Sequence, residues 1–212
     1  MEFISKAIHA YCLKNSSQES EVLQELDRET HVKHLSPRML SGHLQGNFLS
    51  ILSGLIQPNR ILEIGTYTGY SAICLAAGLK KDGKLITIDV NEELEKITKK
   101  HFEKAGLSEK IEFKIGNALE IIPTLSETFD MVFIDADKKN YLNYFYNVKE
   151  KVSRNGLIIA DNVLWSGKTV DEMCNDPETN CLREYNRVVA SDPDFESVLL
   201  PVRDGLMLSR KK

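Results

Sequence analysis

An apolar stretch that ends in an acid and then breaks at two glycines constrains the fold of this chain more than any other feature. Residues 60–71 form a β-type run that ends after Glu63, turns at Gly65 and restarts as a helix near Gly69. A strand, a glycine turn and the beginning of a helix together form the cradle in which α/β folds hold nucleotide cofactors. The stretch therefore predicts an α/β protein with a cofactor site.

The spacing of the glycines selects the kind of cofactor. The dinucleotide motif G-x-G-x-x-G needs three glycines, but Tyr67 and Tyr70 occupy its second and third places. Tyr67 would crowd a pyrophosphate, which requires bare backbone. Asp89 follows at roughly the 20-residue offset at which such folds place an acid on a ribose hydroxyl. A cofactor with a ribose and no diphosphate fits this pattern, which predicts S-adenosylmethionine.

Composition narrows the class of protein further. A chain of 212 residues is long enough for one domain with a full core. The net charge of -4 argues against non-specific binding of nucleic acid, which needs a basic face. No apolar stretch approaches the ~20 residues of a membrane span, and the first residues lack a signal-peptide core. The four cysteines form no C-x-x-C pair, so we expect reduced thiols and a cytoplasmic protein.

The first part of the chain predicts helices. Ser16 and Glu19 have the spacing of a capping box ahead of a helical apolar pattern. A second apolar helix should follow and end before Pro58, because proline cannot continue it.

From residue 60 onward the pattern alternates between strands and helices. Apolar runs are separated by amphipathic segments of helix length; they cover 60–64, 85–89, 111–115, 130–135 and 157–161. This alternation predicts a mostly parallel, Rossmann-like sheet. Two further runs flank Asp204 and Gly205, a hairpin signal, so seven strands are expected and the last is antiparallel. No linker divides the chain, which predicts one domain over 1–212, with helices in 1–57 and the α/β core in 58–212.

Polar residues end four of the five parallel runs, at the edge where open sheets bind ligands. An acid there is more often a helix cap or a loop residue. That interpretation fits Asp130, and it fits Asp137 as a cap for the helix after it, but it fits Asp135 less well, because Asp135 ends a buried run. Asp135 and Asp161, on strands ~4.8 Å apart if they are neighbours, would repel unless one is protonated or a cation lies between them. With Asn162 they offer oxygen ligands for Mg²⁺ or Ca²⁺. From the residues alone, these acids could have a structural role or could bind a metal. An arginine in the place of the ion would exclude the metal.

Two other side chains near these acids have a structural and a functional interpretation. Lys138 follows Asp135 by three residues and is either one of several solvated lysines or a base beside a metal. Trp165, the only tryptophan, is either a core residue or a flat wall for an aromatic substrate. The five histidines share no ligand spacing with these acids.

The combined motifs resemble the cation-dependent O-methyltransferases, the group of caffeoyl-CoA and catechol O-methyltransferases. The matching segments are 62–71, 116–118, 132–138 with 140–144, 161–167 and, more weakly, 201–206. The resemblance runs from about residue 39 to the C-terminus. Pro201 and Trp165 match the caffeoyl-CoA branch, whereas the catechol enzyme has a glutamate at the position of Pro201.

The resemblance implies a role for each matching residue. S-adenosylmethionine would be bound by Ser41, Glu63, Gly65, Thr66, Ser71, Asp89, Ala118 and Asp135. A divalent metal (Mg²⁺, or Ca²⁺ or Mn²⁺) would be held by Asp135, Asp161 and Asn162, with Lys138 as the catalytic base and Asp137 and Trp165 at the substrate. It further implies methylation of one of two vicinal hydroxyls on a catechol-type molecule, of which a caffeoyl-CoA-like thioester is one form, and a homodimer.

Three other functions compete with this hypothesis. A nicotinamide-dependent dehydrogenase has a similar fold, but the failed glycine spacing argues against it. A nucleic-acid methyltransferase conflicts with the charge balance and would need an Asn-Pro-Pro-Tyr-type motif. A catalytically silent adenosyl-binding module, acting through protein contacts, conflicts with the intact set of Asp135, Lys138, Asp161 and Asn162.

Overall fold

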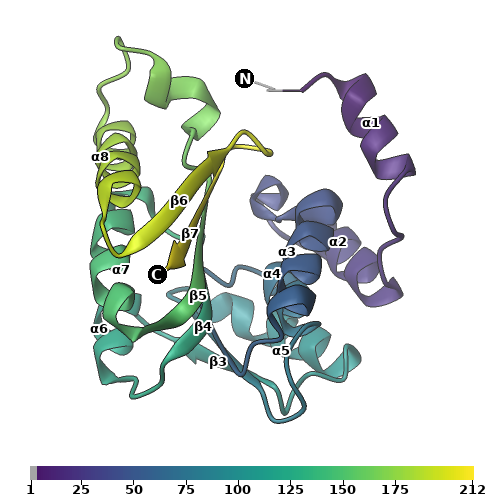
Figure 1. Cartoon of the computed structure of the whole chain (residues 1–212). Coiled ribbons are helices and arrows are strands. Elements are labelled where there is room, and N and C mark those ends of the chain that lie inside the picture. Colours follow the sequence, from purple (N-terminus) through teal and green to yellow (C-terminus); the bar gives the residue numbers. More distant parts are fainter. Residues whose placement is uncertain (1–3) are drawn as a thin grey trace. The chain divides into compact units, whose positions relative to one another are not determined.

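A computed structural model describes residues 4–212, which divide into two compact units (Figure 1). The amino-terminal unit is Lys6–Asn117, and the carboxyl-terminal unit is Ala118–Lys212 together with Ile4 and Ser5. The expectation of a single domain stays a prediction.

Seven strands form a mixed sheet in the order β3-β2-β1-β4-β5-β7-β6. They are β1 (Arg60–Ile64), β2 (Lys84–Asp89), β3 (Ile111–Ile115), β4 (Phe129–Ile134), β5 (Val152–Asp161), β6 (Phe195–Leu200) and β7 (Leu206–Lys211). The β1–β2, β2–β3 and β4–β5 pairs are parallel, whereas β7 runs antiparallel to β5 and β6. The predicted Rossmann-like sheet with an antiparallel last strand is confirmed.

The amino-terminal unit combines three strands with helices. The helices are α1 (Lys6–Lys14), α2 (Glu21–Lys33), α3 (Gly42–Ile56), α4 (Tyr70–Ala76) and α5 (Glu95–Lys104), with short 3₁₀ turns at Pro37–Met39 and Glu92–Leu94. Helix α3 ends in the left-handed residue Gln57 (φ 50°) just before Pro58, as predicted. Helix α4 packs against α3 so closely that Gly78, just beyond α4, touches the α3 backbone at Ser53.

The predicted capping box is wrong. Helix α2 begins after Ser20, whose hydroxyl accepts a hydrogen bond from the Leu23 N–H (3.4 Å). The Ser16 hydroxyl instead donates to the Cys12 carbonyl (2.7 Å) at the end of α1. Glu19 accepts a hydrogen bond from the Tyr70 hydroxyl. The spacing was compatible with a cap, but these side chains had better partners elsewhere in the unit.

An ionic cluster around Glu29 joins α2 to α5. The carboxylate of Glu29, 12% exposed, pairs with Lys33 (2.7 Å), Lys100 (2.6 Å) and the wholly buried His101 (2.9 Å). Hydrogen bonds from Lys100, Lys33 and His101 hold the pKa of Glu29 well below its usual range. Helix α2 is therefore anchored by charge as well as by its apolar side.

The carboxyl-terminal unit has helices on one face of its four strands (Figure 1). They are α6 (Ala118–Ile121), α7 (Tyr141–Val148) and α8 (Pro177–Ser191), with 3₁₀ turns at Ile122–Thr124, Lys138–Asn140, Lys149–Lys151 and Trp165–Val170. Aromatic rings fill the space between helices and sheet: Phe145 lies 6.3 Å from Tyr185 and 5.4 Å from Phe195, between ring centroids. Within residues 4–212, no helix has the length and apolar content that a membrane span requires.

Candidate functional site

The glycine loop after β1 adopts backbone conformations that explain its sequence. Gly65 and Gly69 have φ values of 98° and 92°, in the left-handed region that favours glycine. Tyr67 shares this region at φ 48°, and its N–H donates to Oδ2 of Asp89 (2.8 Å). The second oxygen of Asp89 accepts the N–H of Asn91 (3.0 Å). Asp89, the predicted ribose acid, thus also holds the loop in shape.

A chain of hydrogen bonds lies beneath this loop. The hydroxyls of Thr66 and Thr87 are 2.5 Å apart, and the Thr87 hydroxyl donates to Oε2 of Glu63 (2.5 Å). Glu63 has no exposed surface. A buried carboxylate is a suitable partner for the ammonium group of a methionine moiety, because burying a charge is costly without an ionic partner. These residues fit the predicted cofactor.

The other predicted cofactor residues lie in both units. Ser41 precedes α3 and Ser71 lies in α4; both are 6% exposed. Ala118 begins α6 in the carboxyl-terminal unit and is 5% exposed. Their contacts with a cofactor stay predictions.

The structure places Asp135 and Asp161 at the ends of neighbouring strands. Ile134 of β4 pairs in register with Ala160 of β5, so the two aspartates follow immediately after paired residues. Asp161 is wholly buried. Asn162 has φ 60°, so the chain leaves the strand at this residue, which is the condition for Asp161 and Asn162 to face one ligand. Two carboxylates and an amide oxygen are a suitable donor set for a hard divalent cation.

Two cationic side chains already lie beside these carboxylates. Arg203, in the turn between β6 and β7, is 3.5 Å from Oδ2 of Asp161, and Lys138 is 3.0 Å from Oδ1 of Asp135. Among the described residues, no group of three or more His, Cys, Asp or Glu side chains has the geometry of a metal site. Arg203 was not predicted. An arginine in the place of the ion was expected to exclude a metal, and Arg203 meets that condition at Asp161, so a cation could bind here only by displacing Arg203, and the metal stays a proposal.

Lys138 is not a solvated lysine. It is 8% exposed, whereas its neighbour Lys139 has a side chain that is 60% exposed and pairs with Glu178 (3.2 Å). The Lys138 amine donates to the hydroxyl of Tyr141 (2.5 Å) and lies 5.9 Å from the centroid of the Trp165 ring. Burial, and then the carboxylates nearby, raise the pKa of Tyr141 well above its ordinary value, so the phenol stays protonated.

The remaining acids and Trp165 have mainly structural contacts. Asp137 accepts hydrogen bonds from the Tyr144 hydroxyl and from Nδ2 of Asn140 (2.7 Å), and does not cap the following turn. Asp130 lies within β4 and accepts a hydrogen bond from Ser153 of β5 (3.0 Å), so the prediction that it is a helix cap or loop residue is wrong. The indole N–H of Trp165 is buried without a hydrogen-bond partner among residues 4–212. The roles of Asp137 and Trp165 at a substrate stay predictions.

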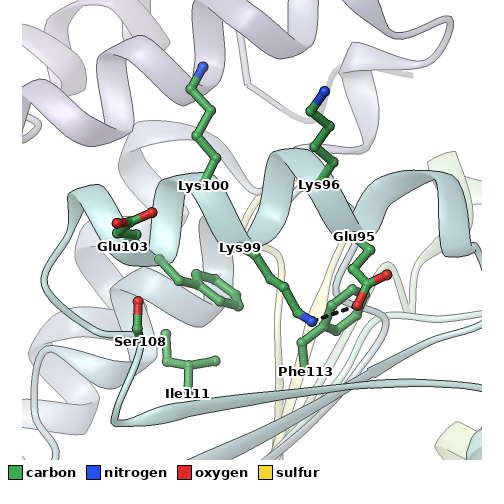
Figure 2. Close-up of a pocket in the computed structure, with 9 residues that line it drawn as sticks. Glu95, Lys96, Lys99, Lys100, Glu103, Ser108, Ile111 and Phe113 are labelled. Atoms are coloured by element: carbon green, nitrogen blue, oxygen red, sulfur yellow. Dashed lines mark hydrogen bonds and ion pairs between the residues drawn. The ribbon is translucent and has the colours of Figure 1, made fainter.

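A separate cavity of about 580 Å³ opens between α5 and β3 in the amino-terminal unit (Figure 2). Phe113 lies beside the Lys99–Glu95 ion pair (2.6 Å). Lys96 and Lys100 also line the cavity, but their amine ends point away from Phe113 and from the ion pair. None of the predicted site residues lines this cavity. Its charged rim indicates a solvated hollow, and we assign it no catalytic role.

Comparison with known proteins places these features in one enzyme class. The family model described as O-methyltransferase matches residues 13–212. The chain is 39% identical to a caffeoyl-CoA O-methyltransferase from Petroselinum crispum, over 98% of this chain and 91% of that protein. It is 38% identical to caffeoyl-CoA O-methyltransferase 5 from Nicotiana tabacum, over 98% and 92% of the two chains.

Solved structures agree with the sequence relatives. The O-methyltransferase from Bacillus cereus in complex with SAH superposes with a TM-score of 0.90 at 30% identity, covering 97% of each chain. TomG from Streptomyces achromogenes, solved with SAM, has a TM-score of 0.88 at 30% identity, covering 97% of this chain and 96% of that one. This chain belongs to the O-methyltransferase family. The predicted enzyme class, an S-adenosylmethionine-dependent O-methyltransferase, is thereby confirmed, and the dehydrogenase alternative is not supported.

Proposed function

We propose that this protein transfers the methyl group of S-adenosylmethionine to one of two vicinal hydroxyls on a catechol-type molecule, assisted by a divalent cation. One observation carries the proposal: two register-matched strand ends present Asp135 and Asp161, with a buried lysine beside the first. The relatives named as caffeoyl-CoA O-methyltransferases support an aromatic acceptor, in which a coenzyme A thioester is one candidate form.

The cofactor would be held by the residues around the glycine loop. The buried carboxylate of Glu63 would pair with the ammonium group of the methionine part. Asp89 would accept hydrogen bonds from the ribose, because each of its oxygens receives one backbone N–H and a carboxylate oxygen has further acceptor capacity. Gly65 would let the backbone approach the cofactor closely.

Lys138 would act as the general base. A phenol has a pKa near 10 and is a poor nucleophile when protonated at neutral pH. When bound, the cation would be held by Asp135, Asp161 and Asn162 and would stabilise the phenolate as a Lewis acid. The acceptor loses its proton to the Lys138 amine. Its oxygen then forms a bond to the methyl carbon as the carbon–sulfur bond breaks, which yields a methyl ether and S-adenosylhomocysteine.

Isotope-labelled methyl transfer tests this proposal. A panel of catechols, flavonoids and acyl-CoA thioesters would be assayed with Mg²⁺ and with EDTA. We expect label in at least one catechol product and loss of transfer in EDTA. Undiminished turnover in EDTA would exclude the cation, and cofactor binding without transfer to any acceptor would favour a silent adenosyl-binding module.

We also propose a homodimer, formed through the amino-terminal helices. Ile51 and Leu55, one turn apart on α3, are 63% and 76% exposed. Apolar side chains on one helix face are typical of a surface that another chain covers. Light scattering should give twice the chain mass for the wild type and the chain mass for Leu55→Glu; a wild-type monomer would contradict the proposal.

A further inference from the structure

Lys138 is held by two hydrogen-bond acceptors in the carboxyl-terminal unit. Its Nζ donates to Oδ1 of Asp135 (3.0 Å) and to the hydroxyl oxygen of Tyr141 (2.5 Å). An ammonium or amine N–H has to donate here, so the tyrosine oxygen accepts. The O–H of Tyr141 is directed at the backbone carbonyl of Asp161 (2.8 Å), with the carbonyl of Ile134 at 3.5 Å. One phenol thus contacts the lysine and the last residues of β4 and β5.

We propose that Tyr141 is a positioning residue that aims the Lys138 amine at the reacting hydroxyl. This inference rests on the proposed function, in which Lys138 takes the acceptor's proton. The lysine nitrogen has four tetrahedral positions, of which one is occupied by its own side chain. Asp135 and Tyr141 take two more, which leaves one position for exchanging a proton with the substrate. The hydroxyl of Tyr141 therefore determines where that last position points.

The hydroxyl of Tyr141 can be removed without changing the aromatic packing around Lys138. The Lys138 nitrogen lies 4.6 Å from the centroid of the Tyr141 ring and 5.9 Å from that of Trp165. Tyr141 is wholly buried. Tyr141→Phe keeps both aromatic walls and removes only the oxygen that accepts from Lys138 and donates to the strand ends. The variant therefore tests the hydroxyl and not the ring.

The chain offers a matched control. Tyr185 of α8 is also wholly buried and packs edge-on against Tyr141, with ring centroids 5.5 Å apart. Its hydroxyl has no hydrogen-bond partner among residues 4–212. Tyr185→Phe therefore removes a buried phenol oxygen next to the site without touching Lys138, and we expect it to leave kcat unchanged.

The first measurement compares kcat with ligand binding, using catechol as the acceptor. We expect Tyr141→Phe to lower kcat roughly 10- to 100-fold, as small misalignments of a reacting group do. The KM values for catechol and S-adenosylmethionine, and the affinity for Mn²⁺, should stay within about twofold of wild type if alignment alone is lost. A kcat equal to wild type, or a loss of Mn²⁺ affinity that accounts for the fall in kcat, would overturn the inference.

A double-mutant cycle with Lys138→Met distinguishes positioning from a general structural role. If Tyr141 acts through the lysine, Tyr141→Phe should not lower kcat further in the Lys138→Met background. An equal loss in both backgrounds would show a structural role and overturn the inference. Wild-type turnover by Lys138→Met would instead remove the base from the proposed function. The two failures are therefore distinguishable.

A second variant covers the case in which Tyr141→Phe does not fold. Placing 3-fluorotyrosine at position 141 keeps the ring and the hydroxyl but makes the oxygen a weaker acceptor. We expect a smaller fall in kcat that depends on Lys138 in the same way. No change in kcat with Lys138 present would contradict the positioning role.

Discussion

The guanidinium of Arg203 lies 3.5 Å from the carboxylate of Asp161, a side chain with no exposed surface. Arg203 reaches it from a strained backbone, because its φ of 53° lies in the left-handed region that disfavours residues with a Cβ. The β6–β7 turn therefore supplies a positive charge at the residue that we propose as a metal ligand. Metal binding and this ion pair should compete.

Arg203→Met should strengthen binding of divalent metal. The substitution keeps an unbranched side chain and removes the charge that competes for Asp161. Because ion pairs that remain partly solvated contribute about 1 kcal/mol or less, we expect the Mn²⁺ dissociation constant to fall by up to about fivefold. Isothermal titration calorimetry with Mn²⁺ measures this directly.

Arg210→Met is the control for that experiment. Arg210 pairs with Glu196 (2.7 Å) between β6 and β7 and is half exposed, so its loss should not change Mn²⁺ affinity. Equal or weaker Mn²⁺ binding by Arg203→Met would show that the arginine does not compete with the metal.

Asp161→Asn should abolish metal binding while the fold persists. The amide keeps the shape of the buried side chain but removes the charge that attracts a dication, so we expect Mn²⁺ affinity to fall at least about 100-fold. Asp130→Asn, at the start of β4, should bind Mn²⁺ like the wild type. Wild-type affinity in Asp161→Asn would remove this residue from the ligand set.

Two glycines that touch each other should respond oppositely to alanine. A Cβ at Gly78 would lie 2.1 Å from the carbonyl carbon of Ser53, and neither backbone can yield easily, whereas a Cβ at Gly54 meets nothing within 4 Å. We expect Gly78→Ala to cost roughly 3 kcal/mol or more of unfolding free energy. Gly54→Ala should add up to about 1 kcal/mol, because alanine favours helix. Urea unfolding of both variants tests the pair, and equal stabilities would contradict the close packing of α3 on its neighbour.

The sequence predicted the strands well because alternation and glycine turns are local signals. Strands β1 to β4 begin and end within one residue of the predicted runs, whereas β5 extends back to Val152, β6 begins at Phe195 and β7 continues to Lys211. The placement of Asp135 and Asp161 at neighbouring strand ends followed from a general rule, since the carboxyl ends of neighbouring parallel strands meet at one edge of the sheet.

The residues that sequence reasoning missed are joined to the site by tertiary structure. Arg203 contacts Asp161 only because the β6–β7 hairpin folds back along β5, and Asp204-Gly205 signals a turn without indicating where its tip lies. Tyr141 lies within the matching segment 140–144, which assigned it no role of its own. Its spacing of three residues from Lys138 is the one local signal that could have revealed it. The burial of Lys138 had no sequence signal, because Lys139 directly after it is a residue of the same type and is solvated.

Acid should destabilise the wild type partly through Glu29. Its pKa in the folded protein is lowered by hydrogen bonds from Lys100, Lys33 and His101, from an ordinary value of 4.5. A lowered folded pKa means that the stabilisation is fully present above the unfolded pKa and is lost as pH falls below it. We expect Glu29→Gln to lose about 1 kcal/mol of unfolding free energy at pH 7 and to show a shallower loss of stability below about pH 5.

Glu25→Gln is the control for this experiment. It removes the neighbouring exposed pair with Lys104 and should change the loss of stability in acid much less. Urea midpoints measured from pH 3 to pH 8 decide the matter, and parallel curves for wild type and Glu29→Gln would show that the cluster contributes nothing to the pH dependence.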